Sequence, residues 1–168
     1  MIEYLSGKIV RRHLNGIILD VNGVGYGLEI PLSALVDLPA NQEPLNLHVF
    51  TRVREDSLKL YGFLTFEDRS VFEILINING VGPKVALAIM STLTVSQLKN
   101  AIESMRIDML ESVPGIGKRT AEKILVELKS KIDRLPDCSS HFSSVASNTS
   151  NHQQGQVGSS ESEVFDDL

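Results

Sequence analysis

Residues Leu75–Ala86 have the sequence LININGVGPKVA, and residues Leu110–Ala121 have the matching sequence LESVPGIGKRTA. Both copies follow the order apolar-x-x-apolar-x-Gly-apolar-Gly-x-x-x-Ala, and corresponding glycines lie 35 residues apart. The paired glycines permit a tight reversal of the chain, and the small alanine lets two helices approach closely. The repeat therefore predicts two helix-hairpin-helix motifs of the same design within one helical region.

The second helix of each motif is expected to begin directly after the second glycine. Its first N–H groups have no partner within the helix, and the helix dipole is positive at this end, so a phosphate oxygen suits the position. Pro83 fits the first turn, where its missing N–H is not needed. One copy could be only a tight corner, but two copies with cations at matching places favour DNA binding through phosphates. The candidate DNA-binding residues are Asn79, Gly80, Val81, Gly82, Pro83, Lys84, Gly115, Ile116, Gly117, Lys118, Arg119 and Thr120.

Nucleotide-binding motifs do not fit these glycines. The dinucleotide pattern Gly-x-Gly-x-x-Gly would need its third glycine where the chain has Leu28, Ile30, Val85 or Thr120. A P-loop ending at Gly117-Lys118 would need glycine in place of Ser112 and a hydroxyl residue in place of Arg119. We therefore expect no nucleotide site and no cofactor.

Residues 1–63 are predicted to form a small β-barrel similar to the OB-fold. Apolar and β-branched runs recur at short intervals, separated by turn residues. Asn15-Gly16 is the strongest hairpin signal, because both residues tolerate the positive φ of a two-residue turn. Glu55-Asp56-Ser57 is expected to turn the last hairpin. About five strands with little room for helix indicate the barrel, so the chain is expected to be an α+β multidomain protein.

Residues 64–134 change to a helical period and form the predicted tandem helix-hairpin-helix domain. Thr94 followed by Gln97 resembles a capping box that starts the middle helix. Three apolar faces repeat with a period of about 3.6 residues. They are Val71, Phe72, Leu75 and Ile78; Leu98, Ala101, Ile102 and Met105; and Ala121, Ile124, Leu125, Leu128 and Ile132.

Residues 135–162 are expected to be a flexible polar and acidic linker. They contain too few large apolar residues to offset the entropy of ordering the chain. Residues 163–168 turn apolar again and are interpreted as the possible start of a third helical domain that is cut short. The formal charge of −5 comes from this end: residues 135–168 hold five acidic side chains and no Lys or Arg, so the preceding regions are nearly neutral.

No catalytic or metal site is expected. The lyase members of the helix-hairpin-helix DNA glycosylases use a lysine two places after the second glycine as the amine nucleophile, and the second copy has Arg119 there, which cannot form a Schiff base. The first copy has Lys84, but its partner acid would fall near Ile102. The four histidines lack metal-ligand spacing, and Cys138 has no basic neighbour that would lower its pKa. No signal peptide or membrane span is recognised, which favours the cytoplasm.

The combination of motifs resembles the bacterial RuvA family, which binds Holliday junctions in branch migration. The resemblance rests on Val53-Arg54-Glu55-Asp56 and Leu60-Tyr61-Gly62-Phe63 in the barrel, followed by the two hairpins, and it covers about residues 1–134. It implies a non-catalytic homotetramer, one or two per junction, that holds an open four-way junction without reading its sequence. Glu55 and Asp56 would form the family's acidic pin near the crossover, with Arg54 as a basic neighbour.

The resemblance also implies partners and a biological setting. ATP hydrolysis would belong to RuvB and junction cleavage to RuvC, in DNA recombination, DNA repair and the SOS response to DNA damage. The family's third domain contacts RuvB, so we expect this chain to bind junctions without supporting motor-driven migration. Two alternatives stay open: a general nucleic-acid-binding protein without junction preference, and a glycosylase-like enzyme.

Overall fold

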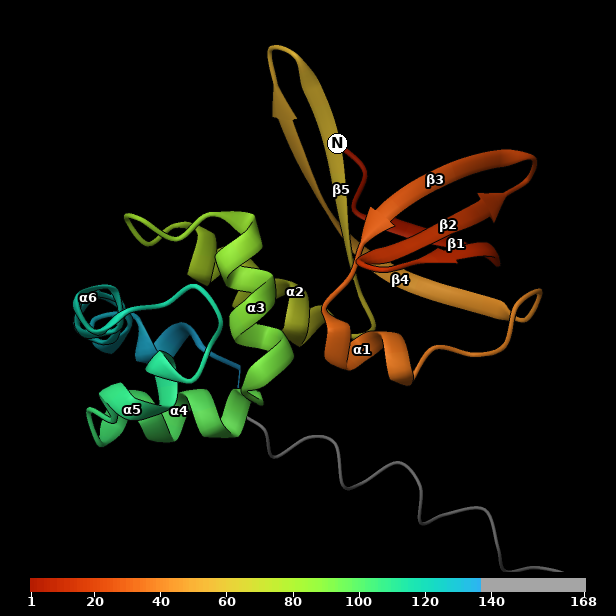
Figure 1. Cartoon of the computed structure of the whole chain (residues 1–168). Helices are drawn as coiled ribbons and strands as arrows, with labels where there is room; N and C mark the ends of the chain where they lie inside the picture. Colours follow the sequence, from red (N-terminus) through yellow and green to blue (C-terminus); the bar gives the residue numbers. More distant parts are fainter. Residues whose placement is uncertain (137–168) are drawn as a thin grey trace, which may run out of the picture. The chain divides into compact units, whose positions relative to one another are not determined.

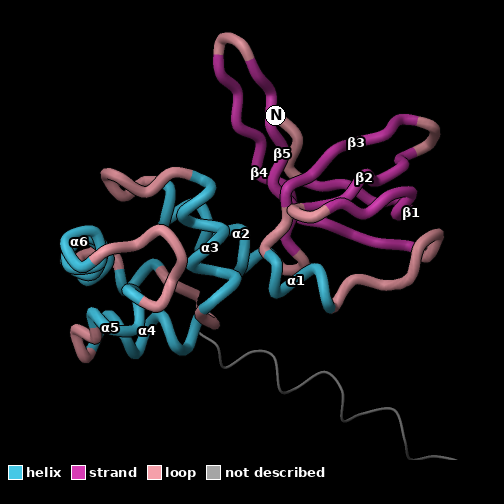
Figure 2. Tube along the Cα trace, in the orientation of Figure 1, coloured by secondary structure: helices cyan, strands magenta, loops and turns pink. Residues whose placement is uncertain are grey.

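The computed structural model describes residues 1–136, and the N-terminal part of this region is a closed five-stranded barrel (Figures 1 and 2). The strand order is β1-β2-β3-β5-β4, and β4 returns to pair with β1. All neighbours are antiparallel except β3 and β5, which run parallel over two residue pairs. The strands are β1 (Tyr4–His13), β2 (Gly16–Val21), β3 (Val24–Glu29), β4 (Pro44–Arg54) and β5 (Ser57–Phe63).

The barrel closes around an apolar core that follows the period-two alternation of the strands. Leu45, Leu47 and Val49 of β4 point inward, and polar or less buried residues lie between them. Ile9, Ile17 and the other inward residues are almost completely shielded from solvent. The predicted OB-like barrel and its α+β setting are confirmed.

The hairpin predicted around Asn15-Gly16 is present, because β1 pairs with β2 and His13 lies opposite Gly16, but neither Asn15 nor Gly16 has the expected positive φ. Positive φ occurs at the next hairpin, where Asn22 (52°) and Gly23 (88°) form the two-residue turn between β2 and β3. Gly16 lies inside β2, where an added Cβ would approach the carbonyl oxygen of Leu28 to 2.0 Å. This glycine is therefore needed for close approach of β3, whereas Asn22-Gly23 supplies the turn.

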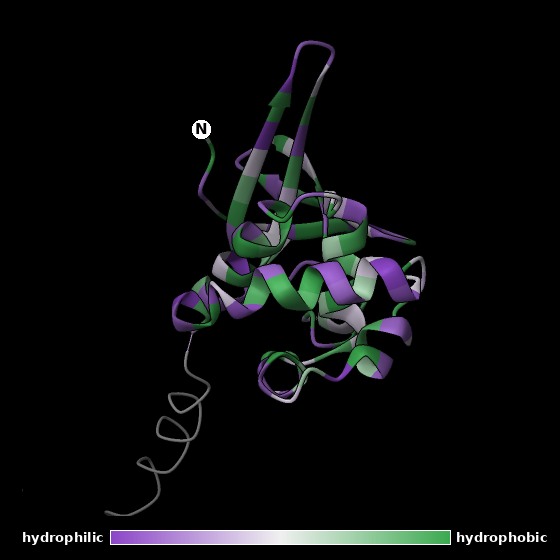
Figure 3. Ribbon diagram, turned by 90° about the vertical axis from the view of Figure 1, so that its left-hand side faces the viewer, coloured by the Kyte–Doolittle hydropathy of each residue, from purple (hydrophilic) through white to green (hydrophobic). Residues whose placement is uncertain are grey.

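Two features of the barrel region position the candidate site. A five-residue helix, α1 (Leu32–Val36), lies between β3 and β4 and was not predicted. The β4–β5 hairpin projects well beyond the other strands, and its tip is hydrophilic (Figures 1 and 3). Glu55 and Asp56 form the turn at this tip, directly after Arg54.

The remaining described chain is helical, as expected. Thr94 begins α4 with the predicted capping box: its hydroxyl accepts from the Gln97 N–H at 3.2 Å, and the Gln97 side chain accepts from the Thr94 N–H at 2.9 Å. The elements are α2 (Phe66–Ile76), α3 (Pro83–Thr92), α4 (Val95–Glu103), α5 (Ile107–Glu111), α6 (Lys118–Lys129) and the 3-10 turn η1 (Ile132–Arg134).

Each predicted apolar face runs one residue too far. Ile78 is buried but follows the end of α2, and Met105 lies after α4 with a φ of 50° and 39% exposure. Ile132 belongs to η1 and is only partly buried. Periodicity extended each helical face to these residues because it does not detect where the backbone leaves the helical conformation.

The described residues form two apolar clusters, one in the barrel and one among the helices. Aromatic residues join the helical cluster to β4 and β5: the Phe72 ring lies 5.5 Å from Phe50, 5.0 Å from Tyr61 and 5.0 Å from Phe63, between ring centroids. The division at residues 63 and 64 stays a prediction. The predicted linker and third-domain start fall almost entirely in residues 137–168, outside the described part of the chain.

No single described helix is long and apolar enough to span a membrane. Helices α3 and α4 meet the length and composition requirement only as a pair, with a bend of 98° between them. Their apolar side chains, including Ile89 and Ile102, are buried in the helical cluster.

Candidate nucleic-acid interface

The two hairpins have the same backbone structure. In the first, Ile78 N–H donates to Leu75 O at 3.1 Å and Val81 N–H donates to Ile78 O at 3.0 Å. The second hairpin repeats both bonds, each at 3.1 Å, among Leu110, Val113 and Ile116. The sequence repeat is therefore a structural repeat.

The two glycines of each pair have different roles. Gly80 and Gly115 have φ values of 92° and 90°, a conformation that L side chains rarely adopt. Gly82 and Gly117 have ordinary extended φ values, −86° and −93°, and are the N-caps of α3 and α6. An added Cβ at any of the four would meet no atom within 4 Å. The first glycine is thus needed for the turn, and the second leaves open space at the helix terminus.

The helix termini that face this open space have no side-chain cap. Neither Gly82 nor Gly117 offers a side-chain acceptor, and no other side chain of residues 1–136 caps α3 or α6. The first N–H groups of both helices are therefore available to an external acceptor, and the helix dipoles favour an anion. Pro83 occupies the first turn of α3, as predicted, so this terminus has one donor fewer than α6.

The cations predicted beside the hairpins are at the surface, whereas the two apolar turn residues are not. Lys84, Lys118 and Arg119 are exposed. Val81 and Ile116 are 5% and 6% exposed, and their N–H groups bond within the hairpins. Phosphate contacts are therefore open to the glycine and helix-terminal N–H groups and to the cations, while Val81 and Ile116 anchor the turns in the core.

A contact from α6 distinguishes the first hairpin from the second. The Asn79 N–H donates to Glu127 Oε2 of α6 at 3.2 Å, and Lys131 Nζ, just after this helix, donates to Asn77 O at 3.4 Å. The position equivalent to Asn79 in the second hairpin is Pro114, which has no N–H to satisfy. Helix α6 starts at the second hairpin and ends against the first, so it joins the two turns through one rigid element.

Glu127 was not predicted, and its contact gives a specific expectation. Glu127→Ala removes the acceptor that holds Asn79 and should weaken duplex binding by about threefold to tenfold, the value of one net hydrogen bond. Glu127→Gln keeps an acceptor oxygen and should bind nearly as the unmodified chain does. Titration of a fluorescent duplex measures both.

The control for this expectation is Glu122→Ala. Glu122 is exposed on the same helix, and its removal takes away the same negative charge. Loss of a carboxylate alone should leave DNA affinity unchanged or raise it. Glu122→Ala should therefore not weaken binding, whereas Glu127→Ala should. Equal effects would show that Glu127 does not position the first hairpin.

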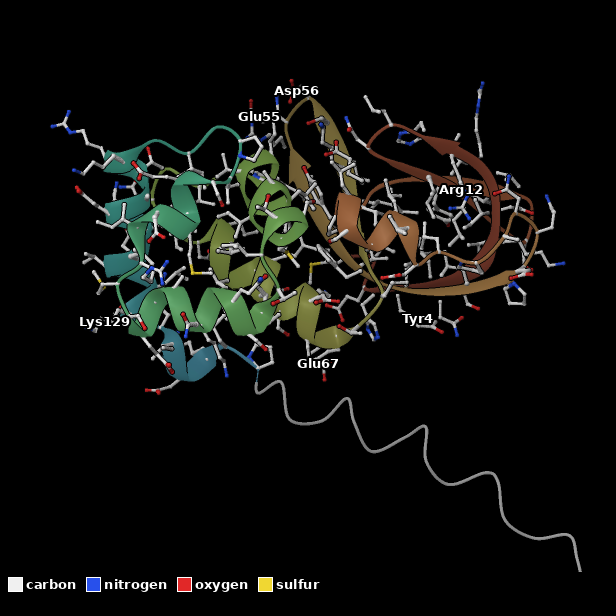
Figure 4. All side chains as sticks on the ribbon, turned by 60° about the horizontal axis from the view of Figure 1, so that its bottom comes forward. Tyr4, Arg12, Glu55, Asp56, Glu67 and Lys129 are labelled. Atoms are coloured by element: carbon white, nitrogen blue, oxygen red, sulfur yellow. The ribbon has the colours of Figure 1, made fainter. Side chains whose placement is uncertain are left out.

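The acidic residues at the β4–β5 tip stand apart from the hairpins. Glu55 and Asp56 are exposed, with no ion pair among residues 1–136, and point away from the barrel (Figure 4). Arg54, which precedes them at the end of β4, is also exposed. Within the same residues, no group of three or more His, Cys, Asp or Glu side chains could hold a metal ion.

The barrel and the hairpin region each match a known domain family. Residues 1–62 match the RuvA N terminal domain, and residues 72–130 match a SAM-like helix-hairpin-helix tandem. The protein named Holliday junction branch migration complex subunit RuvA from Pseudomonas fluorescens (strain SBW25) is 45% identical over 168 residues, which are 100% of this chain and 82% of that protein. The chain belongs to the RuvA family.

Other RuvA subunits show the same relationship. The subunit from Pelobacter propionicus is 47% identical over 135 residues, covering 80% of this chain and 68% of its own length. The subunit from Legionella pneumophila (strain Corby) is 40% identical over 156 residues, covering 92% and 78%. The RuvA N-terminal match includes the β4–β5 tip, and the tandem match includes both hairpins.

Proposed function

We propose that this chain is the non-catalytic DNA-binding subunit of a Holliday junction branch migration complex. The observation that carries the proposal is the duplicated hairpin, in which two uncapped helix termini with neighbouring cations are joined by α6. The names of its relatives supply the junction as substrate. Each pair of hairpins holds one DNA arm by its phosphates, so binding is independent of base sequence.

The junction geometry calls for more than one copy of the chain. A four-way junction has four arms, and a homotetramer presents one pair of hairpins to each arm. Glu55 and Asp56 of each copy then lie near the point where the strands exchange. Their carboxylates repel the phosphates there and favour an open crossover. One or two tetramers occupy a junction.

The chemistry of migration and cleavage belongs to partners in this proposal. The chain itself needs no cofactor, RuvB supplies ATP hydrolysis and RuvC cuts the junction. The setting is DNA recombination and repair in the cytoplasm, including the SOS response to DNA damage. The net charge of −5 does not oppose DNA binding, because the excess of acidic residues lies after residue 134, away from the hairpins in the sequence.

The salt dependence of binding tests the electrostatic part of the proposal. Lys118→Ala should reduce the slope of log K against log salt by roughly 0.9 for each phosphate that the lysine neutralises. Affinity should fall equally for duplexes of different sequence, because the lysine binds phosphate. Fluorescence titration at several salt concentrations measures the slope. An unchanged slope accompanied by an altered base preference would show that Lys118 reads bases and would contradict the proposal.

A further inference from the structure

The root of the β4–β5 hairpin lies where β4 loses its neighbour β1. Pairing between these two strands ends at Tyr4 and His48. At the next residue, Val49 N–H donates to Glu3 O at 2.8 Å, and Val49 O accepts from Arg69 Nε at 2.8 Å. Arg69 belongs to α2, so a helix side chain satisfies a carbonyl on the edge of the strand. The outer edge of β4 is thus tied to the helical region at the point where the hairpin leaves the barrel.

The Arg69 side chain is held between this carbonyl and its own helix. It is only 12% exposed, and its second terminal nitrogen lies 3.0 Å from Glu73 Oε1, one turn further along α2. The contact with Glu3 Oε1 is 3.9 Å long and reaches a side chain that is 61% exposed, so it adds little. A planar guanidinium presents its N–H groups in fixed directions. Arg69 therefore holds Val49 and Glu73 at one set angle, in a place that water screens little.

The outer part of the hairpin has no other strand beside it. Strands β1 and β3 pair with no residue between Thr51 and Leu60. The pairs in this part are Arg52 with Lys59, Val53 with Leu58, and Arg54 with Ser57. Glu55 at the tip is six residues beyond Val49, or about 20 Å along the strand, so a rotation of about 10° at Val49 moves the tip by about 3.5 Å. That shift exceeds the length of a hydrogen bond, so the angle at the root determines where the tip lies.

Apolar packing alone does not set this angle. The ring of Phe72 in α2 contacts Phe50, Tyr61 and Phe63 at the root, which keeps the helix and the hairpin together. Burial of apolar surface has no preferred direction, however, whereas a hydrogen bond weakens steeply when it bends. The aromatic contacts therefore supply attraction, and the bond from Arg69 to Val49 supplies direction.

We propose that Arg69 is a positioning residue, which holds the acidic tip in a fixed place relative to the two helix-hairpin-helix turns. This inference rests on the proposed function. When the turns bind an arm, a fixed tip is directed at the crossover. A linear duplex needs only the turns, whereas a junction engages the turns and the tip together. Arg69 should therefore affect the preference for junctions and leave the affinity for duplex unchanged, although its own side chain is nearly buried.

The test compares Arg69→Met and Arg69→Lys in the full chain. Methionine keeps an apolar stem without the guanidinium. Lysine is the milder change for folding, because it keeps the charge, but its single ammonium cannot reproduce the two directed bonds. Both variants should lower the preference for a four-way junction over linear duplex by at least about fivefold, the lower end of coupling between two sites. Duplex affinity should change by less than about twofold, as for independent sites. Competition titration measures both affinities, and thermal unfolding shows that each variant is folded.

A distance measurement on the free chain tests the positioning directly. Spin labels are attached through Asp56→Cys at the tip and Glu122→Cys on α6, both exposed, in a chain with Cys138→Ser. The labelled chain is diluted with unlabelled chain, so that each measured distance lies within one copy. The distance distribution should be narrow with Arg69 present and clearly broader in Arg69→Met.

Glu73→Gln is the matched control. It removes the ion pair within α2 but leaves the bond from Arg69 to Val49, so it should change the junction preference much less than Arg69→Lys. An equal effect would assign the preference to the helix and contradict the proposal.

Two further results would overturn the proposal: an unchanged preference with an unchanged distance distribution in both Arg69 variants, or an equal loss of junction and duplex binding. Lys118→Gln separates such a failure from that of the proposed function. If it weakens binding to both DNAs while the Arg69 variants keep the junction preference, only the positioning role is wrong. If it changes neither affinity, the proposed function itself fails.

Discussion

Replacing Gly82 and Gly117 together by alanine is expected to weaken DNA binding by at least about a hundredfold, because each methyl group occupies the space where a phosphate meets several N–H donors. The free chain has room for both methyl groups, since neither added Cβ meets an atom within 4 Å. Both residues also have φ values that alanine adopts. The fold should therefore remain, with a loss of at most about 1 kcal/mol per helix from the poorer N-cap.

Gly115→Ala is the matched control for this expectation. Gly115 belongs to the same turn as Gly117, but its φ of 90° makes any side chain strained. Its replacement should destabilise the fold by about 1 to 3 kcal/mol. Thermal unfolding and DNA titration together separate the two effects. Unchanged DNA affinity in the Gly82/Gly117 double variant would show that the helix termini do not hold phosphate.

Neutralising the acidic tip should tighten binding to linear duplex by about tenfold or more at low salt. Glu55→Gln with Asp56→Asn keeps side chains of the same size that suit the turn, and it removes two negative charges from each copy. Phosphates near the tip would no longer be repelled, so the preference for junctions over duplex should shrink. Competition titrations at low salt, where screening is weakest, measure this preference.

A second acidic pair tests whether the position of the two negative charges, and not only their removal, determines the junction preference. Glu67 and Asp68 lie in the first turn of α2, and Glu67 is well away from the tip in Figure 4. Glu67→Gln with Asp68→Asn removes the same charge and should change the junction preference much less. An unchanged preference in the tip variant would mean that Glu55 and Asp56 only suit a solvent-exposed turn.

Local patterns predicted the barrel, the helical period and both hairpins, and the errors arise from interactions between residues distant in sequence. Asn15-Gly16 and Asn22-Gly23 are the same dipeptide and both lie at hairpins, but Gly16 is paired within β2 close to the Leu28 carbonyl, whereas Gly23 is a turn residue with positive φ. Helix α1 has five residues and is held by hydrogen bonds to Ser91 and to Met90 of α3. The sequence of residues 32–36 alone does not indicate these hydrogen-bond partners, so it did not predict the helix.

In the candidate site, too, local motifs could be predicted and contacts between distant residues could not. The hairpin glycines and their cations could be found because every part of each motif lies within twelve residues. Glu127 could not, because its partner Asn79 is 48 positions away. Arg52 and Lys59 carried a usable signal: a two-residue turn at Glu55-Asp56 places them directly opposite each other. Counting the register back from the tip would have identified this pair of cations.

The most direct test of the central claim is a competition experiment with the full chain. A labelled four-way junction is titrated with the protein and challenged with unlabelled junction, linear duplex and single strand of equal length and mixed sequence. Junction-selective binding predicts that unlabelled junction competes at much lower concentration than either other DNA, whatever the base sequence of its arms. Equal competition by linear duplex or by single strand would contradict the account and favour a general nucleic-acid-binding protein.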